Sequence, residues 1–238
     1  MMQVWAHRGA SGYAPENTIP AFALALAQGA GGVEFDVQLS ADGHPVVIHD
    51  ESLNRTTDGH GDVAELTLAQ IQQYDASDDK DGYSGVRVPS LDETLAFLAP
   101  TGSHINIELK NSQVDYPGLE QAVLALVERH QIRDRLTISS FNQHSLRRVR
   151  QLDATVRLGM LYTDPFYRPW KHAKKLGVQA VHPPLYDATA KLLRKCAERS
   201  LGSAIWTVND ADDIQRMARY GAHAIITDYP DQAIQALA

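Results

Sequence analysis

Val33-Glu34-Phe35-Asp36-Val37 and Val46-Val47-Ile48-His49-Asp50 are the two segments on which the fold prediction depends. Both are rich in β-branched and apolar residues, as strands are, yet both contain ionisable side chains that buried strands normally exclude. Because successive side chains of a strand point to opposite faces, Glu34 and Asp36 share one face. The two carboxylates, roughly 7 Å apart along the strand, repel each other unless a positive group lies between them, and a divalent cation with oxygen ligands satisfies both.

The connection between these two strands predicts a hairpin. Asp42-Gly43 is a dipeptide that favours tight turns. If these are the two turn residues, His49 lies opposite Asp36. If the turn begins one residue earlier, His49 lies opposite Glu34. In either register, His49 is on the face that carries the carboxylates.

The composition describes an ordinary soluble globular protein. The chain has 238 residues, of which 44% are hydrophobic and 21% charged, and its net charge is -7. This length allows a full-sized core and is close to that of a (β/α)8 barrel. An acidic balance without a basic stripe argues against nucleic acid as a partner, although local arginines and a metal can still attract a phosphate substrate.

Cysteine usage and hydropathy predict a cytoplasmic location. Cys196 is the only cysteine, so an intrachain disulfide is impossible, which suits a reducing compartment. The segment Met1-Met2-Gln3-Val4-Trp5 runs directly into a strand and lacks the basic and apolar regions of a signal peptide. The longest apolar run is too short to cross a bilayer. We therefore expect a cytoplasmic protein without stable membrane insertion.

Regular alternation of strands and helices predicts one TIM (β/α)8 barrel over residues 1–238. A strand at 4–6, a helix from Asn17 or Thr18 to about Gln28, and the Val33 strand form the first βαβ unit. The chain up to residue 88 is long for a connection, so we expect residues 40–88, hairpin included, to be an insertion. Eight parallel strands favour a barrel over a doubly wound open sheet, the alternative. The other expected elements are strands at 104–110, 136–140, 157–162, 179–182, 203–208 and 224–227, and helices such as 91–98, 119–130, 143–151, 188–199 and 211–220.

Ionisable residues concentrate where the expected strands end, which is where barrel enzymes place their active sites. Glu34, Asp36 and Glu108 are carboxylates with few matching cations on neighbouring strands, so a metal site is favoured over a salt-bridged interior. His7 and His49 each lie at a strand end beside charged residues, which makes them candidates for catalysis.

The remaining candidates also have plain structural interpretations. Arg8 could pair with a carboxylate, but its planar fork also suits phosphate oxygens. Lys110 could balance the charge of Glu108 or bind the same phosphate. Trp206 could pack the barrel mouth or form an aromatic wall beside a small substrate. His182 also ends a strand, but we expect it to be structural.

These residue types together predict phosphodiester cleavage. A hard cation with Arg8 and Lys110 would neutralise a phosphate and the charge that develops during displacement. His7 and His49 could serve as base for the attacking oxygen and acid for the leaving oxygen. Sugar isomerisation fits less well, because it needs one base and an electrophile rather than two acid–base groups around an anion.

Short motifs along nearly the whole chain carry a family resemblance. They are His7-Arg8-Gly9, Pro15-Glu16-Asn17-Thr18, Glu34-Phe35-Asp36-Val37, Asp42-Gly43, His49-Asp50, Leu53, Arg55-Thr56-Thr57, Val88-Pro89-Ser90-Leu91, Glu108-Leu109-Lys110, Ser139-Ser140-Phe141, Trp206-Thr207-Val208-Asn209 and Thr227-Asp228-Tyr229-Pro230. In these motifs the sequence resembles the glycerophosphodiester phosphodiesterase family. Ser40 and Ser90 stand where that family often has threonine, and neither belongs to the expected chemistry. The chain lacks the export signal of periplasmic members and is similar to the bacterial cytosolic type.

The resemblance implies a TIM barrel with a small insertion after strand two, and a small-molecule glycerophosphodiester as substrate. The products would be sn-glycerol 3-phosphate and an alcohol. In the family picture the glycerol 2-hydroxyl attacks phosphorus and water opens the cyclic phosphate; which histidine is the first base stays open. The implied site consists of a Mg²⁺ or Ca²⁺ site at Glu34, Asp36 and Glu108, acid–base catalysis by His7 and His49, and phosphate binding by Arg8 and Lys110.

Two other functions are alternatives. A related phosphodiesterase acting on lysophospholipids or phosphoinositides would need a wide apolar mouth or a membrane-inserting loop, and the polar segment 75–81 argues against one. A non-catalytic barrel that binds a phosphorylated ligand is disfavoured, because every expected catalytic residue is present. The sequence leaves the oligomeric state open.

Overall fold

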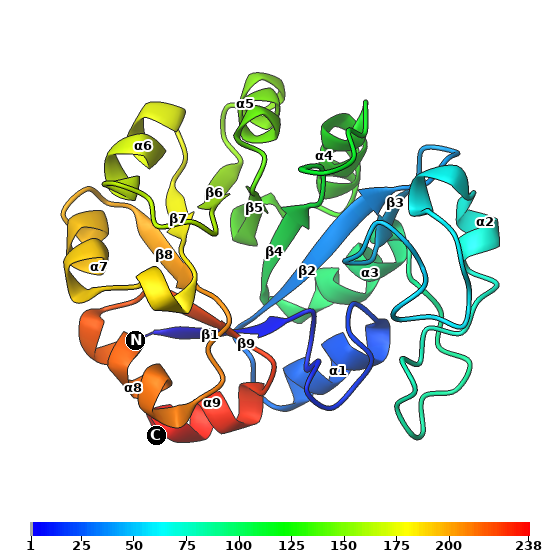
Figure 1. Cartoon of the computed structure of the whole chain (residues 1–238), viewed down its shortest axis with the longest axis horizontal. Coiled ribbons are helices and arrows are strands. Elements are labelled where there is room, and N and C mark those ends of the chain that lie inside the picture. The colour runs from blue at the N-terminus through cyan, green and yellow to red at the C-terminus, as the bar shows by residue number, and fades with distance from the viewer. Residues whose placement is uncertain (1) are drawn as a thin grey trace.

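Eight parallel strands close into a ring at the centre of the molecule (Figure 1). The structure is a computed structural model that describes residues 2–238. Neighbouring strands follow the order β1-β9-β8-β7-β6-β5-β4-β2, and β2 pairs again with β1, which closes the barrel. This confirms the predicted TIM barrel and excludes the open sheet. The strands are β1 (Gln3–His7), β2 (Gly32–Leu39), β4 (His104–Leu109), β5 (Leu136–Ser140), β6 (Arg157–Leu161), β7 (Ala180–His182), β8 (Gly202–Ile205) and β9 (Ala224–Thr227).

Helices alternate with the strands and cover the outside of the barrel (Figure 1). The first helix is capped by Thr18, whose Oγ1 accepts a hydrogen bond from the Ala21 backbone N at 3.4 Å, and not by Asn17. Among residues 2–238, no helix has both the length and the apolar character needed to span a bilayer. The helices around the barrel are α1 (Ile19–Ala27), α3 (Leu91–Leu98), α4 (Leu119–Arg129), α5 (Gln143–Leu152), α6 (Pro169–Leu176), α7 (Ala190–Ala197), α8 (Ala211–Tyr220) and α9 (Pro230–Leu237).

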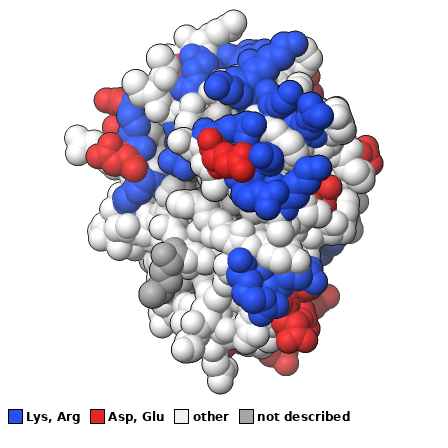
Figure 2. All heavy atoms as spheres, turned by 90° about the vertical axis from the view of Figure 1, so that its left-hand side faces the viewer, with Lys and Arg blue, Asp and Glu red and all other residues white. Residues whose placement is uncertain are grey.

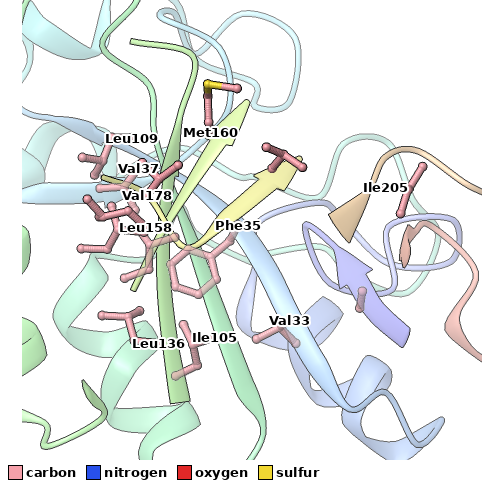
Figure 3. Packing of buried hydrophobic residues seen from close by; sticks show 14 of the residues in the cluster. Val33, Phe35, Val37, Ile105, Leu109, Leu136, Leu158, Met160, Val178 and Ile205 are labelled. Carbon is pink, nitrogen blue, oxygen red and sulfur yellow. The ribbon is translucent and has the colours of Figure 1, made fainter. Parts of the chain in front are cut away.

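Alternate residues of the strands separate an apolar outer face from the barrel interior. Figure 3 shows Val33, Phe35 and Val37 of β2 near Ile105 and Leu109 of β4, all in the main hydrophobic core. Each is fully buried, and burying such a side chain stabilises the fold by about 1.5–3 kcal/mol. The residues between them point the other way. The hydrophobic pattern of β2 and β4 therefore sends their acidic side chains into the barrel.

The hairpin after β2 forms in a register that neither prediction included. β3 (Pro45–Val47) runs antiparallel to β2, with Val47 opposite Val37. The connection is one residue longer than a two-residue turn, and Gly43 accommodates it with a positive φ of 78°. If the ladder continued in this register, His49 would point to the apolar face of β2. The strand ends at Val47, however, so the chain leaves the sheet before His49 and this residue reaches the carboxylate side by another path.

The segment between β3 and α3 builds a small hydrophobic core of its own. It contains a 3-10 turn, η1 (Val63–Glu65), and the single-turn helix α2 (Leu68–Ile71), and the rest is irregular. The cluster lies within the range 40–88 that we expected to be inserted, and it keeps this largely irregular segment packed. Its buried residues are Val46, Ile48, Leu53, Val63, Ile71, Ala76 and Val88.

Lysine and arginine side chains gather on one face, over α6 and α7 (Figure 2). Residues 166–199 contain eight Lys or Arg against two Asp or Glu, in a chain whose net charge is -7. This face is therefore basic, contrary to the expectation that the chain has no basic stripe. The basic residues come together because two consecutive helices present them on the same side of the barrel.

Three histidines surround Trp5 inside the barrel. The ring of His104 stacks on Trp5 with centroids 4.4 Å apart, and His182 and His223 meet it edge-on at 6.2 and 6.4 Å. His182 is fully buried. Burial is the main reason that the pKa of His182 falls to about 3 and that of His104 to about 4, and the nearby Arg157 contributes to both.

We expect acid to destabilise the protein through these histidines. In the folded state His182 stays neutral down to about pH 3, whereas in the unfolded chain it gains a proton near pH 6.5. Below pH 6.5 the unfolded state thus binds more protons, so stability falls as pH drops, by about 3 kcal/mol for His182 alone between pH 7 and pH 4. Urea titrations between pH 7 and pH 4 measure how steeply the free energy of unfolding falls with pH. His182→Leu should make this fall less steep. An unchanged pH dependence would show that His182 does not cause it.

Candidate active site

Three buried carboxylates from two adjacent strands form one cluster. Glu34 and Asp36 come from β2 and Glu108 from β4, and Asp36 and Glu108 are register partners. One oxygen of each lies within 4.8 Å of the other two, and the three residues are at most 8% exposed. The parallel pairing of β2 and β4 therefore brings together the three acidic residues that the sequence analysis had grouped.

Two basic residues lie against this cluster. Arg8 donates its backbone N–H to Glu34 Oε2 at 3.1 Å, and its Nε lies 3.3 Å from Asp36 Oδ2. Lys110 Nζ lies 3.0 Å from Glu108 Oε1 and 3.9 Å from Asp36 Oδ1. Within residues 2–238, Arg8 Nε makes no hydrogen bond, although it is ion-paired with Asp36.

Burial and mutual repulsion oppose full ionisation of the cluster. Burial is the main cause that raises the pKa of Glu34 well above its usual range, and repulsion from Asp36 and Glu108 adds to it. Burial, with repulsion from Asp36, also raises the pKa of Glu108 to about 7. Burial opposes ionisation of Asp36 too, but neighbouring cations led by Arg8 outweigh it and lower the pKa. A divalent cation would supply the missing positive charge, and carboxylate oxygens suit a hard cation.

A carboxylate holds His7 in place. Its Nδ1 lies 2.6 Å from Asp228 Oδ1, immediately after β9, which leaves Nε2 on the side of the pocket that His7 lines. Asp228 also accepts hydrogen bonds from Ser11 Oγ at 2.9 Å and Asn209 Nδ2 at 2.6 Å. A carboxylate at Nδ1 fixes the tautomer and orientation of an imidazole that exchanges protons through Nε2.

His49 has a similar partner in the next residue. Its Nδ1 lies 2.6 Å from Asp50 Oδ1, and its Nε2 lies 3.1 Å from Lys110 Nζ. Burial is the main cause that lowers the pKa of His49, and the charge of Lys110 adds to it. The imidazole is therefore kept largely neutral at pH 7, as a general base requires.

A chain of ion pairs connects the His49–Asp50 pair to Arg8. Arg55 donates from Nε to Asp50 Oδ2 and from Nη2 to Glu16 Oε1, both at 2.7 Å. Glu16 also accepts from Arg8 Nη1 at 2.9 Å. Because Arg55 belongs to the segment after β3, its contacts fix that segment against the loop before α1.

Asn17 supports the carboxylate cluster from the loop before α1. Its Nδ2 donates to Asp36 Oδ2 at 3.0 Å, and its Oδ1 accepts from the Asp36 backbone N at 3.2 Å. Asn17 and Arg8 both have left-handed backbone conformations, with φ of 59° and 55°, and the Asn17 N donates to Arg8 O at 2.9 Å. Such conformations cost free energy in non-glycine residues and concentrate at functional sites.

The cluster and the histidines open into one pocket of about 90 Å³ at the carboxyl ends of the strands. Trp206 forms part of its apolar wall; its Nε1 donates to His182 O at 2.8 Å, and its ring meets Phe141 edge-on. The lining residues are His7, Arg8, Glu34, His49, Asn106, Glu108, Lys110, Ser139, Phe141, Leu161, His182, Trp206 and Ile226.

The structure brings together all eight residues that the sequence analysis selected: seven line the pocket, and Asp36 belongs to the carboxylate cluster. Asp50 and Asp228, the two imidazole partners, were not among the expected site residues. Both stood in quoted motifs, and Asp50 follows His49 directly, which was the available signal. His182, which we expected to be structural, also lines the pocket.

Comparisons with known proteins identify the family of this chain. The model of the "Glycerophosphoryl diester phosphodiesterase family" matches residues 7–232. A glycerophosphodiester phosphodiesterase of Caldanaerobacter subterraneus is 38% identical over 232 residues, which cover 97% of this chain and 96% of the relative. One of Bacillus altitudinis is 38% identical over 239 residues, covering 99% and 98%.

Solved structures show the same architecture. An Oleispira antarctica phosphodiesterase in complex with the product sn-glycerol-3-phosphate superposes with a TM-score of 0.91 at 32% identity, covering 99% of this chain and 96% of that one. A glycerophosphodiester phosphodiesterase of Agrobacterium tumefaciens gives 0.88 at 29% identity and covers both chains completely. The chain described here therefore belongs to the glycerophosphoryl diester phosphodiesterase family and is a hydrolase.

Proposed function

We propose that this enzyme hydrolyses glycerophosphodiesters to sn-glycerol 3-phosphate and an alcohol, with Mg²⁺ or Ca²⁺ held by Glu34, Asp36 and Glu108. One observation carries the proposal: the carboxylate cluster, two carboxylate-held histidines and two cationic side chains meet in one pocket of about 90 Å³. Family membership supports it, as does the product complex of the Oleispira antarctica relative.

Arg8 and Lys110 bind the phosphate in this mechanism. Both are half-buried beside the carboxylates, where electrostatic interactions are stronger than in water. The guanidinium of Arg8 lies against Asp36, and the ammonium of Lys110 lies between Glu108 and His49. The bound cation would add Lewis-acid polarisation of a phosphoryl oxygen.

His7 and His49 transfer the protons. One takes the proton of the glycerol 2-hydroxyl as its oxygen bonds to phosphorus, and the other protonates the alcohol oxygen as its bond to phosphorus breaks. The cyclic phosphate is then opened by water, with the same two groups acting in reverse. Asp228 and Asp50 are positioning residues, because each holds an imidazole through Nδ1 and so directs Nε2 to the reaction; the Nε2 of His49 also contacts Lys110, one of the two phosphate-binding residues.

The test is release of sn-glycerol 3-phosphate from purified enzyme, followed with a coupled assay. Glycerophosphocholine, glycerophosphoethanolamine and glycerophosphoglycerol are compared, each with Mg²⁺ and with Ca²⁺. We expect turnover of at least one diester at a rate well above background. Binding of the diesters without any cleavage would instead support the non-catalytic barrel.

Location and domain organisation complete the proposal. Cys196 is buried, and the structure pairs it with no other cysteine, which is consistent with a reducing compartment such as the cytoplasm. We place residues 1–238 in one catalytic domain and treat residues 40–88 as its insertion. The separate small cluster of the inserted segment and the ion pairs of Arg55 support this division.

A further inference from the structure

The deepest wall of the pocket is polar, and neither the predicted chemistry nor the family motifs account for it. Asn106 and His182 line this wall and are 1% and 0% exposed. Asn106 lies two residues before Glu108 on the same face of β4, and it is the register partner of Glu34. It therefore sits deeper in the barrel than Glu108, at the level of Glu34.

Both side chains present polar atoms without protein partners. Asn106 Nδ2 donates to Ser139 Oγ at 3.0 Å, but its Oδ1 has no hydrogen-bond partner among residues 2–238. The same holds for Nδ1 and Nε2 of His182. Leaving a buried donor or acceptor unsatisfied costs about 1–3 kcal/mol each, so this wall favours a ligand that brings hydrogen-bonding groups.

The sequence makes room for His182 at this position. Gly159 on the neighbouring strand β6 faces the imidazole, and a Cβ there would lie 2.5 Å from His182 Nε2. Below the imidazole, the Trp5 ring closes the barrel at a centroid distance of 6.2 Å. The imidazole therefore forms the floor of this part of the pocket, which has a volume of only about 90 Å³.

We propose that Asn106 and His182 bind the terminal (sn-1) hydroxyl of the glycerol end of the substrate, so that the enzyme selects diesters whose glycerol is unacylated. This inference rests on the proposed function and deepens it. A hydroxyl both donates and accepts, which matches the Asn106 Oδ1 acceptor and a neutral imidazole with one donor and one acceptor nitrogen. The glycerol enters first, its phosphate stops at Arg8 and Lys110, and the variable alcohol faces the mouth beside Trp206.

The floor also excludes one class of alternative substrates. In a lysophospholipid the sn-1 oxygen carries an acyl chain, which the closed floor has no room for and which would leave the polar atoms of Asn106 and His182 unpaired. The alcohol side has no such limit, because it faces the open end of the pocket. We therefore expect strict selection for the glycerol end and tolerance for the alcohol.

The experiment compares three substrates with wild-type enzyme: glycerophosphoethanolamine, its 1-deoxy analogue, which keeps the 2-hydroxyl, and lysophosphatidylethanolamine. We expect kcat/KM for the analogue to be 10- to 100-fold lower, and that for the lysolipid lower still. Equal rates for glycerophosphoethanolamine and the analogue, or rapid lysolipid cleavage, would overturn the inference and leave the proposed function intact. No cleavage of any glycerophosphodiester would overturn the proposed function itself.

Two matched variants test whether His182 causes the preference for glycerophosphoethanolamine over its 1-deoxy analogue. His182→Leu should lower kcat/KM for glycerophosphoethanolamine 10- to 100-fold and reduce the preference over the analogue to within about threefold, since the two changes remove the same interaction. Calorimetry should show weaker binding of sn-glycerol 3-phosphate but unchanged binding of inorganic phosphate. The control, His104→Leu, removes a half-buried histidine that does not line the pocket and should keep the full preference. A His182→Leu enzyme that keeps it would refute the assignment; if that variant does not fold, the wild-type comparison still decides.

Discussion

Replacing His7 or His49 with asparagine should lower kcat by about 10²- to 10⁴-fold, the usual contribution of a general acid or base. Each imidazole has its Nδ1 held at 2.6 Å by a carboxylate, so the two side chains are oriented before substrate binds. Asparagine keeps a polar group at Nδ1 but cannot exchange a proton. The measurement is steady-state release of sn-glycerol 3-phosphate, with KM determined separately to distinguish loss of turnover from loss of binding.

His60→Asn is the matched control, because His60 is exposed and outside the pocket. It should leave both constants unchanged. The double variant of His7 and His49 should lose little more than the worse single variant if the two groups act in one coordinated step. Near-normal rates in either single variant would show that the wrong histidine had been chosen.

The fold was predictable because its signal is local. Alternation of Val33, Phe35 and Val37 with Glu34 and Asp36 identifies both a strand and the contents of its two faces, and eight such units leave few alternatives to a barrel. The hairpin register was not predictable to one residue, because a longer loop with Gly43 at positive φ competes with the two-residue turn. His49 reached the predicted side because β3 ends early, and not for the reason first given.

The less predictable parts of the site depend on contacts across the closed barrel. Asp228 follows the last strand and holds His7 at the end of the first, and this pairing exists only because β9 lies beside β1. His182 enters the pocket because Gly159, on another strand, lacks a side chain at the opposing position. The periodicity within one segment cannot predict contacts between residues of different strands, such as these two. A rule that every strand-end histidine be matched with a strand-end carboxylate would have found Asp50 and Asp228.

Removing divalent cations should abolish turnover and also lower the thermal stability of the protein. Burial and mutual repulsion raise the pKa of Glu34 and Glu108, so in the metal-free protein two of the three carboxylates resist ionisation. A bound cation favours the ionised form of these carboxylates. At a concentration 100 times its Kd, the cation adds about 2.7 kcal/mol to the free energy of unfolding. For a chain of this length that corresponds to a rise in Tm of roughly 5–10 °C.

The measurement pairs activity with thermal unfolding, after exhaustive chelation and after return of Mg²⁺ or Ca²⁺. Because the pKa of Glu108 is about 7, protons should compete with the cation below that pH, so the metal-induced rise in Tm should shrink between pH 8 and pH 6. Glu108→Gln should lose both the activity and most of the metal-induced rise in Tm. Glu120→Gln is the control, because it removes a buried carboxylate that pairs with Arg148 outside the pocket. This variant should keep the metal-induced rise in Tm. Full turnover by the chelated wild-type enzyme would remove the metal from the mechanism and leave the raised pKa values of the cluster as a property of the protein alone.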